Sequence, residues 1–216
     1  MMTDAFVHEM FYRGQAALER LSQVHIVLCG AGALGSHLCD NLVRQGVRHL
    51  TVIDMDRVET HNIGTQIYDE GDIGAFKAEV MRARCFRATG AEIEAITRQL
   101  TDRNIAKLFR GADLVCDTFD NASSRRLVTE YCRQHQLACL HLGVNAGYGE
   151  VKWNEGYRIP ADVIAPHVCD YPLARNLILF MVALGTEVAL RFLLDGQKQN
   201  YSFTLRDLTI NLEPRG

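Results

Sequence analysis

The segment Val27-Leu28-Cys29-Gly30-Ala31-Gly32-Ala33-Leu34-Gly35 governs how the rest of this chain folds. Its apolar first part is typical of a buried parallel strand, and three glycines in G-x-G-x-x-G spacing follow it. After the last glycine, Leu38, Leu42 and Val43 recur at the spacing of one helix face. The segment therefore predicts a strand, a tight turn and a helix start, an arrangement whose free N–H groups bind phosphate.

Length and composition indicate one α/β domain over residues 1–216. Hydrophobic residues make up 48% of the sequence, which is enough for a substantial core. The net charge is -3 and no dense basic run is present, so we expect no binding to nucleic acid. The N-terminus lacks the features of a signal segment, and the longest apolar run, Leu177–Leu184, is too short to span a bilayer. We therefore expect no membrane association.

The cysteines indicate a reducing compartment. The chain has 7 cysteines and no C-x-x-C pair. An odd number without framework spacing predicts free thiols, and therefore a cytoplasmic protein. The same spacing argues against a structural zinc site with cysteine ligands, so no zinc is expected.

The order of elements predicts a Rossmann-like, doubly wound, mostly parallel sheet, extended by C-terminal antiparallel strands. We divide the domain into an N-terminal helical segment (1–22), a nucleotide-binding core (23–145) and a C-terminal part with a crossover loop (146–216). In the C-terminal part, alternating residues predict two hairpins, one of 150–153 with 157–159 and one of 201–205 with 208–212. A long apolar helix is expected over 172–194, in the core or in a subunit interface.

Three polar positions at strand ends and helix starts are candidates for nucleotide contacts. Asp54 ends the second strand about 20 residues after the last glycine, where dinucleotide-binding folds place a ribose-binding carboxylate. Lys77 stands at a helix start, where its charge opposes the helix dipole, which hints at a nearby phosphate. Asp120 follows the fourth strand, and a carboxylate near polyphosphate suits Mg²⁺. The structural alternatives are a loop cap for Asp54, an exposed side chain for Lys77 and a helix N-cap for the pair Asp120 and Asn121.

The whole series resembles the ThiF/MoeB/HesA family, the bacterial relatives of the ubiquitin-activating enzymes. The resemblance runs from about Gln15 to Leu212 and rests on motifs in a fixed order. These are Gly30-x-Gly32-x-x-Gly35, Asp54-Met55-Asp56, Asn62 with Gln66, Gly74-x-x-Lys77 and Asp117-Thr118-Phe119-Asp120-Asn121. The resemblance implies an enzyme that uses ATP and Mg²⁺ to adenylate a carboxylate, usually the C-terminus of a ubiquitin-like or sulfur-carrier protein. A peptide or small carboxylate substrate stays open, and a homodimer is expected.

The resemblance also implies the site residues. The nucleotide-binding set is Gly30, Ala31, Gly32, Ala33, Leu34, Gly35, Asp54, Asp56, Asn62, Gln66, Lys77, Asp120 and Asn121. Asp120 is the expected Mg²⁺ ligand. The catalytic set is Lys77, Asp120, Cys169 and Arg13, with Cys169 in the crossover loop as a reactive thiol and Arg13 reaching the ATP of the other subunit in a dimer. For Arg13, an ordinary solvated helix charge is the alternative interpretation.

Two departures from the family pattern keep other interpretations open. Thr65 occupies the place of a usual arginine, and the paired C-x-x-C zinc ligands of many members are missing. Thr65 favours a second class of function, a non-catalytic partner subunit with the same fold, whereas Lys77 and Asp120 oppose it. A third interpretation, an NAD-binding oxidoreductase, explains the glycine turn and Asp54 but leaves Lys77 and Asp120 without a role.

Overall fold

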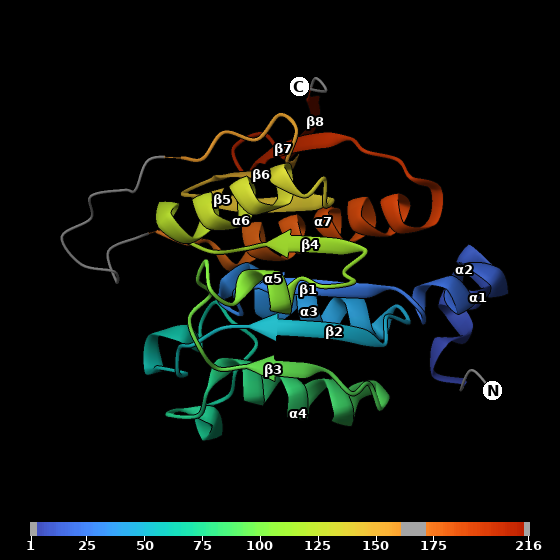
Figure 1. The fold of residues 1–216 in the computed structure, drawn as a ribbon, viewed down its shortest axis with the longest axis horizontal. Helices are drawn as coiled ribbons and strands as arrows, with labels where there is room; N and C mark the ends of the chain where they lie inside the picture. The colour runs from blue at the N-terminus through green and yellow to red at the C-terminus, as the bar shows by residue number, and fades with distance from the viewer. Residues whose placement is uncertain (1–3, 161–171, 214–216) are drawn as a thin grey trace.

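One mixed sheet of eight strands, in the order β3-β2-β1-β4-β5-β6-β7-β8, runs through the computed structural model (Figure 1). The structure describes residues 4–160 and 172–213. The strands are β1 (His25–Cys29), β2 (His49–Ile53), β3 (Glu94–Ile96), β4 (Leu114–Asp117), β5 (Cys139–Asn145), β6 (Tyr148–Trp153), β7 (Asn200–Thr204) and β8 (Thr209–Glu213). The first five are parallel, and β6, β7 and β8 are antiparallel to their neighbours, so the expected fold class is confirmed.

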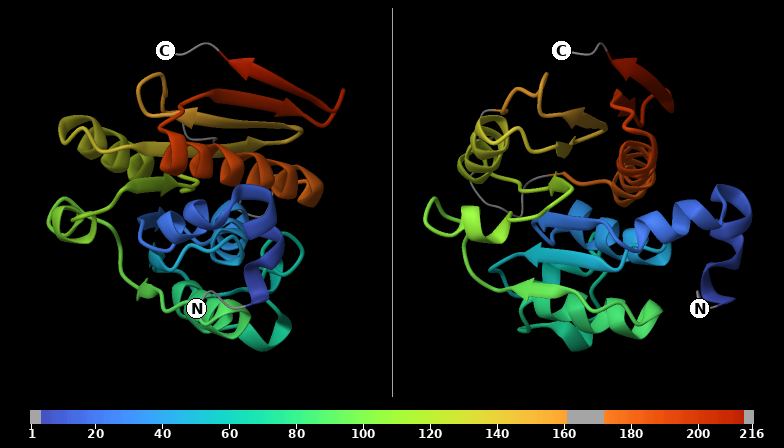
Figure 2. Two further views of the ribbon diagram at one scale, coloured as in Figure 1. Left: turned by 90° about the vertical axis from the view of Figure 1, so that its right-hand side faces the viewer. Right: turned by 45° about the vertical axis from the view of Figure 1, so that its right-hand side comes forward.

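Helices cover both faces of the sheet (Figure 2). They are α1 (Val7–Arg13), α2 (Gln15–Leu21), α3 (Ala33–Arg44), α4 (Lys77–Thr89), α5 (Ile105–Leu108), α6 (Ala122–Gln134) and α7 (Arg175–Asp195), with short 3₁₀ turns η1 (Asp4–Phe6), η2 (Thr60–Asn62) and η3 (Glu70–Asp72). Alternate residues of β1 serve the two faces, since Ile26 and Leu28 join the larger core cluster and Val27 and Cys29 the smaller one. The larger cluster includes residues of α3, α4 and α7, and the smaller one residues of α5 and α6.

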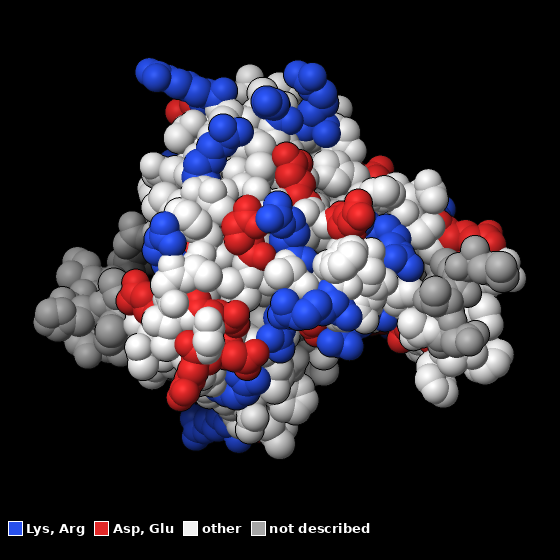
Figure 3. All heavy atoms as spheres, turned by 90° about the horizontal axis from the view of Figure 1, so that it is seen from below, with Lys and Arg blue, Asp and Glu red and all other residues white. Residues whose placement is uncertain are grey.

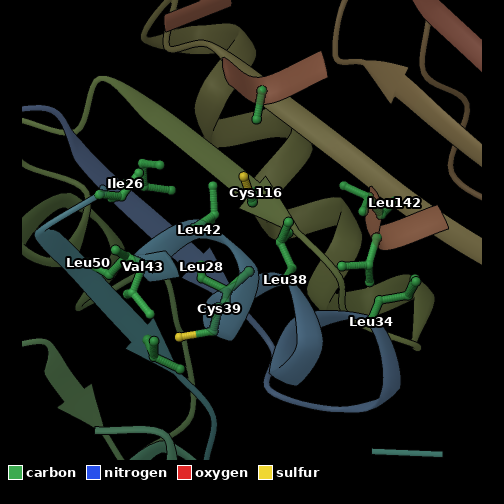
Figure 4. Packing of buried hydrophobic residues seen from close by; sticks show 14 of the residues in the cluster. Ile26, Leu28, Leu34, Leu38, Cys39, Leu42, Val43, Leu50, Cys116 and Leu142 are labelled. Atoms are coloured by element: carbon green, nitrogen blue, oxygen red, sulfur yellow. The ribbon is translucent and has the colours of Figure 1, made fainter. Parts of the chain in front are cut away.

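Helix α3 forms the centre of the larger core. The leucines Leu34, Leu38 and Leu42 are at most 5% exposed and pack on the apolar face of β1 and its neighbours (Figure 4). The helical spacing of these residues, read from the sequence, is therefore the spacing of the buried face. Because α3 begins directly after the glycine turn, this packing fixes where the turn sits relative to the sheet.

The strand order reverses between β1 and β4. Cys29 at the end of β1 lies beside Asp117 at the end of β4, so the glycine turn and the segment that follows Asp117 meet at one edge. In open α/β sheets the crevice outside the carboxyl ends of the strands, at such a switch point, is where ligands bind.

The first predicted hairpin is wrong in its pairing. The alternating residues of β6 pair with β5 through a tight connection at Ala146 and Gly147, and residues 157–159 form no strand. Ala146 has a φ of 52°, a conformation usually taken by glycine or asparagine, so the connection carried no clear turn signal. The second hairpin, β7 with β8, is confirmed.

The N-terminal helical segment is confirmed but contains a break. Gly14, with a φ of 87°, separates α1 from α2, so the two form a bent pair rather than one helix. Helix α2 buries Leu18 and Leu21 against the body of the domain, whereas α1 buries none of its residues.

Helix α7 packs against α3, β5 and β6 as the last helix of the domain. By length and composition alone it could cross a membrane, but ten of its residues are buried, and an apolar core helix has the same composition. The helix begins at Arg175 rather than at Pro172, and Gly196, with a φ of 70°, ends it as a left-handed cap. On the face seen from below in Figure 1, acidic and basic side chains are interspersed, in keeping with the weakly acidic composition (Figure 3).

Candidate active site at the switch point of the sheet

The three glycines of the turn lie in different structural environments. Gly30 has a φ of 94°, which only glycine adopts without strain. A Cβ on Gly35 would lie 2.0 Å from the carbonyl oxygen of Gly30, so glycine is required for α3 to approach the turn. A Cβ on Gly32 would meet nothing within 4 Å. Gly32 precedes the first turn of α3, where N–H groups lack helical partners, and the open space above it suits a phosphate.

Asp54 is built into this turn. Its side chain is 8% exposed, its Oδ2 accepts a 2.6 Å hydrogen bond from the N–H of Ala31, and its Oδ1 accepts one of 2.8 Å from the N–H of Asp56. Burial raises the pKa of the Asp54 carboxyl, although the N–H of Ala31 and the charge of Lys77 act in the opposite direction. The carboxylate therefore holds the turn, and its contact with a ribose stays a prediction.

Lys77 is not the exposed lysine of the structural alternative. It is 7% exposed at the first residue of α4, and its Nζ lies 3.5 Å from Oδ2 of Asp56. The backbone N–H of Lys77 also donates to the carbonyl of Asp56 at 2.9 Å. A buried ammonium at a helix start requires nearby negative charge, and the acidic pair Asp54 and Asp56 supplies part of it.

The loop after β2 folds back onto the glycine turn. The hydroxyl of Tyr68 donates to the carbonyl of Ala31 at 2.6 Å, and Nε2 of His37 lies 3.1 Å from the carbonyl oxygen of Thr65. Asn62 is 3% exposed, and its Oδ1 accepts from the N–H of Glu59, so it shapes the loop.

Two further features of this loop concern Gln66 and Arg175. Within the described part of the chain, Oε1 of Gln66 is buried and has no hydrogen-bond partner. Buried acceptors are normally paired, so this oxygen could accept a hydrogen bond from a ligand. The guanidinium of Arg175, from the start of α7, donates to the carbonyl of Gly64 at 3.3 Å. An arginine therefore flanks Thr65 even though the sequence lacks one at that position.

Of the pair Asp120 and Asn121, the second takes the structural role considered for them, and the Mg²⁺ role of the first stays a prediction. Asn121 is the N-cap of α6, with Oδ1 accepting from the N–H of Ser124 at 2.9 Å. Asp120 is exposed in the turn between β4 and α6, and within the described part of the chain its side chain accepts one hydrogen bond, of 3.4 Å, from the Asn121 amide. Among residues 4–160 and 172–213, no three acidic, histidine or cysteine side chains form a metal-binding group. A single exposed carboxylate is compatible with Mg²⁺ beside a polyphosphate, because the ion keeps waters and phosphate oxygens as its other ligands.

Of the remaining two expected residues, Arg13 does not join this cluster. Arg13 donates to Glu187 at 2.7 Å and to Glu9 at 2.8 Å, within its own chain. These bonds outweigh its burial and raise its pKa. Arg13 is therefore neither a solvated charge nor a neighbour of the glycine turn, and its role toward a second subunit stays a prediction. Cys169 lies outside the described residues, and the six described cysteines are buried and free.

A buried polar cluster beneath Asp120 was not predicted. Asp117 and His141 are both 0% exposed, and Nδ1 of His141 lies 2.8 Å from Oδ2 of Asp117. Arg125, 6% exposed, approaches the same oxygen at 3.5 Å and donates to the hydroxyl of Tyr157 at 2.8 Å. The only signal in the sequence was a histidine inside an apolar strand, and nothing indicated which polar residues it would meet.

A match to a family model identifies the family of this chain. Residues 7–158 match the model described as the ThiF family. The chain belongs to the ThiF family. This region holds the glycine turn, Asp54, Lys77 and Asp120, so the resemblance found from the motif series is confirmed.

Curated relatives and solved structures agree with this assignment. The chain is 33% identical over 135 residues to a tRNA threonylcarbamoyladenosine dehydratase of Haemophilus influenzae, covering 61% of this chain and 51% of that one. It is 37% identical over 119 residues to a sulfur carrier protein adenylyltransferase of Thermus thermophilus, covering 54% of this chain and 44% of that one. The chain thus spans about half the length of these relatives.

Among solved structures, the fold resembles MccB of Escherichia coli. The complex of MccB with MccA-N7isoASN gives a TM-score of 0.84 at 16% identity, covering 99% of this chain and 72% of that one. The complex of MccB with ATP gives a TM-score of 0.82 at 15% identity, with the same coverage. At this identity the likeness concerns the fold, including the antiparallel strands β7 and β8, which lie beyond the residues matched by the family model.

Proposed function

We propose that this protein is an ATP-dependent adenylyltransferase that activates a carboxylate as an acyl-adenylate. The observation that carries the proposal is the placement of Lys77, buried beside Asp54 and Asp56, at the same sheet edge as the glycine turn and the exposed Asp120. A ribose site, a phosphate cradle, a cation and a free carboxylate together suit a Mg²⁺-bound triphosphate.

The residues suggest how the reaction proceeds. A carboxylate oxygen of the substrate forms a bond to the α-phosphorus of ATP while the bond to the β-phosphate oxygen breaks, and pyrophosphate leaves with the electron pair. The substrate is already ionised, so no general base is required. The N–H groups at the start of α3 and the ammonium of Lys77 would offset the charge that develops on the phosphate oxygens. Mg²⁺, held by Asp120, would neutralise the leaving pyrophosphate.

ATP is favoured over NAD by Lys77 and Asp120. Both ligands would place phosphates at Gly32 and a ribose at Asp54. A carboxylate such as Asp120 repels a dinucleotide pyrophosphate that carries no metal, whereas it is a ligand beside Mg²⁺ and ATP. The oxidoreductase interpretation also leaves the buried ammonium of Lys77 without a function.

The activated carboxylate is proposed to be the C-terminus of a ubiquitin-like or sulfur-carrier protein. The name of the Thermus thermophilus relative, a sulfur carrier protein adenylyltransferase, supports this class, and a peptide or a small carboxylate is the alternative substrate. We further propose a cytoplasmic homodimer, on the basis of the free cysteines and the exposed apolar residues of α7.

The test is calorimetric titration with ATP and with NAD, followed by ATP–pyrophosphate exchange with candidate carboxylates. We expect ATP binding without NAD binding, and we expect Lys77→Ala and Asp120→Ala to lower the exchange rate by on the order of 10²-fold or more. Arg87→Ala is the matched control for Lys77→Ala, because Arg87 is an exposed residue in the last turn of the same helix, α4. Glu130→Ala is the matched control for Asp120→Ala, because Glu130 is an exposed residue of α6, the helix that follows Asp120. NAD binding without ATP binding would overturn the proposal, and exchange unaffected by either substitution would overturn the two roles.

A non-catalytic partner subunit is distinguished by the same measurements. Such a subunit would bind ATP weakly or not at all and would show no exchange with any carboxylate offered. The buried position of Lys77 argues against it, because burying an ammonium without a functional ligand costs stability.

A further inference from the structure

The polar cluster beneath Asp120 joins four separate parts of the fold. Asp117 ends β4, His141 lies in β5, Arg125 lies in α6 and Tyr157 follows β6. The rings of His141 and Tyr157 stack at 3.8 Å with an angle of 6° between their planes. The second guanidinium nitrogen of Arg125 donates to the carbonyl of Leu142 at 2.8 Å, so the arginine is held on both sides.

His141 has a side-chain oxygen beside each of its two ring nitrogens. Its Nδ1 faces a carboxylate oxygen of Asp117, and its Nε2 lies 2.9 Å from Oδ1 of Asn154. The amide nitrogen of Asn154 donates to the carbonyl of Thr129, which leaves Oδ1 as the atom that faces the ring. Contacts at both ring nitrogens therefore hold the ring of His141 in one orientation beside Asp117.

Asp117 links this cluster to the turn that bears Asp120. Its Oδ2 receives His141 and Arg125, whereas its Oδ1 accepts a 3.1 Å hydrogen bond from the backbone N–H of Phe119. Phe119 is the residue immediately before Asp120. The carboxylate thus connects two buried side chains to the backbone of the turn that carries the exposed Asp120, which Thr118 and Asn121 also hold through their own hydrogen bonds.

The energetics favour a role beyond packing. Apolar residues of similar volume can replace a buried ionic cluster without loss of stability, so stability alone is weak grounds for having one. A carboxylate that orients the backbone of a neighbouring turn does what an apolar side chain cannot do, because it accepts a hydrogen bond from that backbone.

We propose that Asp117, held by Arg125 and His141, is a positioning residue that fixes the turn carrying Asp120. The inference rests on the proposed function in so far as Asp120 binds Mg²⁺ there. The positioning itself does not depend on the ligand, because the hydrogen bond to Phe119 is present in the protein alone.

The deciding variant is Asp117→Asn. Its single amide oxygen meets two donors at the Oδ2 position and one donor at the Oδ1 position, so the oxygen turns toward Arg125 and His141. The amide nitrogen then faces the N–H of Phe119, and that hydrogen bond is lost. We expect the backbone amide of Phe119 to exchange with solvent roughly tenfold faster in the unliganded protein. We also expect the Mg²⁺ concentration for half-maximal ATP–pyrophosphate exchange to rise about tenfold or more.

Two further variants separate positioning from general loss of stability. Tyr157→Phe removes the acceptor of Arg125 while keeping the ring, and we expect smaller shifts in the same direction; it decides the question if Asp117→Asn does not fold. Thr186→Val is the control, because Thr186 is buried, accepts from Asn41 and donates to Val182, and shares no hydrogen bond with the cluster.

Faster exchange at Phe119 in Asp117→Asn or Tyr157→Phe, with none in Thr186→Val, supports the inference. Unchanged exchange at Phe119, or an equal change in Thr186→Val, overturns it. If the wild-type protein binds no ATP, the proposed function fails, whereas the amide-exchange result still decides whether Asp117 positions the turn.

Discussion

At the scale of single residues, Gly32 and Gly35 offer a matched pair of substitutions. Gly32→Ala adds a methyl group to open space at a φ of -78°, so we expect a normally folded protein. The methyl group would occupy the place of a phosphate, and ATP binding should weaken by more than about tenfold, since losing a buried polar contact costs on the order of 1–3 kcal/mol.

Gly35→Ala should instead destabilise the fold. Its methyl group would lie 2.0 Å from backbone, so we expect a loss of about 1–3 kcal/mol in unfolding free energy and a lower melting temperature. Urea denaturation and calorimetric ATP titration of both variants give the comparison. Equal affinity for ATP in Gly32→Ala and wild type would show that phosphate does not lie above this glycine.

The pKa of Asp117 predicts how the stability of the fold changes with pH. Burial alone raises the pKa of this carboxyl, but the charge of Arg125 and the hydrogen bond from His141 hold it below its ordinary value. Because the folded-state pKa lies below the ~3.9 of an unfolded aspartate, the ionised carboxylate stabilises the fold fully above about pH 4. That contribution is lost as the pH falls through the folded-state pKa.

Asp117→Asn should therefore be less stable than wild type by on the order of 3 kcal/mol at pH 7, because Arg125 is left buried without its counter-charge. The difference should shrink below about pH 4, where protonated Asp117 resembles asparagine. Urea denaturation over a series of pH values measures this. A difference that stays constant with pH would contradict the assignment, and Thr186→Val, which changes no charge, gives the constant reference.

At the scale of elements, Arg13 joins α1 to α7, and two variants can test whether this is its only role. The arginine holds Glu187, and its side chain is 11% exposed. If Arg13 only fastens the helix, Arg13→Ala and Glu187→Gln should each cost at most about 1 kcal/mol of stability and leave ATP–pyrophosphate exchange unchanged.

We expect the two variants to differ. Arg13→Ala should also lower exchange, because the family resemblance places this arginine at the ATP of the other subunit, while Glu187→Gln should not. Exchange rates and melting temperatures of both proteins provide the test. Equal exchange rates in the two variants would leave Arg13 as a structural residue only.

The elements also show what could be predicted from the sequence and what could not. The parallel core followed from the glycine motif and apolar runs, because local periodicity determines which face of each strand or helix is buried. The pairing of β6 did not follow, since Ala146 takes a left-handed conformation without being glycine. At the site, Gly32 and Asp54 were found by spacing along the chain. The contact of Asp117 with His141 was not, because distant segments meet only when the sheet assembles.

At the scale of the whole molecule, the apolar side chains of α7 and β8 predict the oligomeric state. Phe180 is 50% exposed and stacks on Phe203, whose partner across the strands is Ile210, 53% exposed. Leu212 lies on the same face of β8 and is 64% exposed. Such a contiguous apolar surface is typical of an interface.

We expect light scattering to report a dimer at micromolar concentration, and Phe180→Glu combined with Leu212→Glu to give a folded monomer. Phe86→Glu is the control, because Phe86 is 57% exposed on α4, a different helix. A wild-type monomer at this concentration, or a double variant that stays dimeric, would mean that this surface is not the interface.

The engagement of Asp54 with the glycine turn has a consequence for the thermodynamics of binding. Its carboxylate already holds the N–H groups of Ala31 and Asp56 in the free protein, so the loss of conformational entropy of the turn occurs on folding. Because the turn is already ordered, a ligand without a ribose should gain as much affinity from this order as ATP does. Asp54→Ala should therefore weaken the binding of inorganic pyrophosphate as well as ATP, with a more unfavourable entropy in titration calorimetry, whereas a carboxylate that contacts only ribose would leave pyrophosphate binding unchanged.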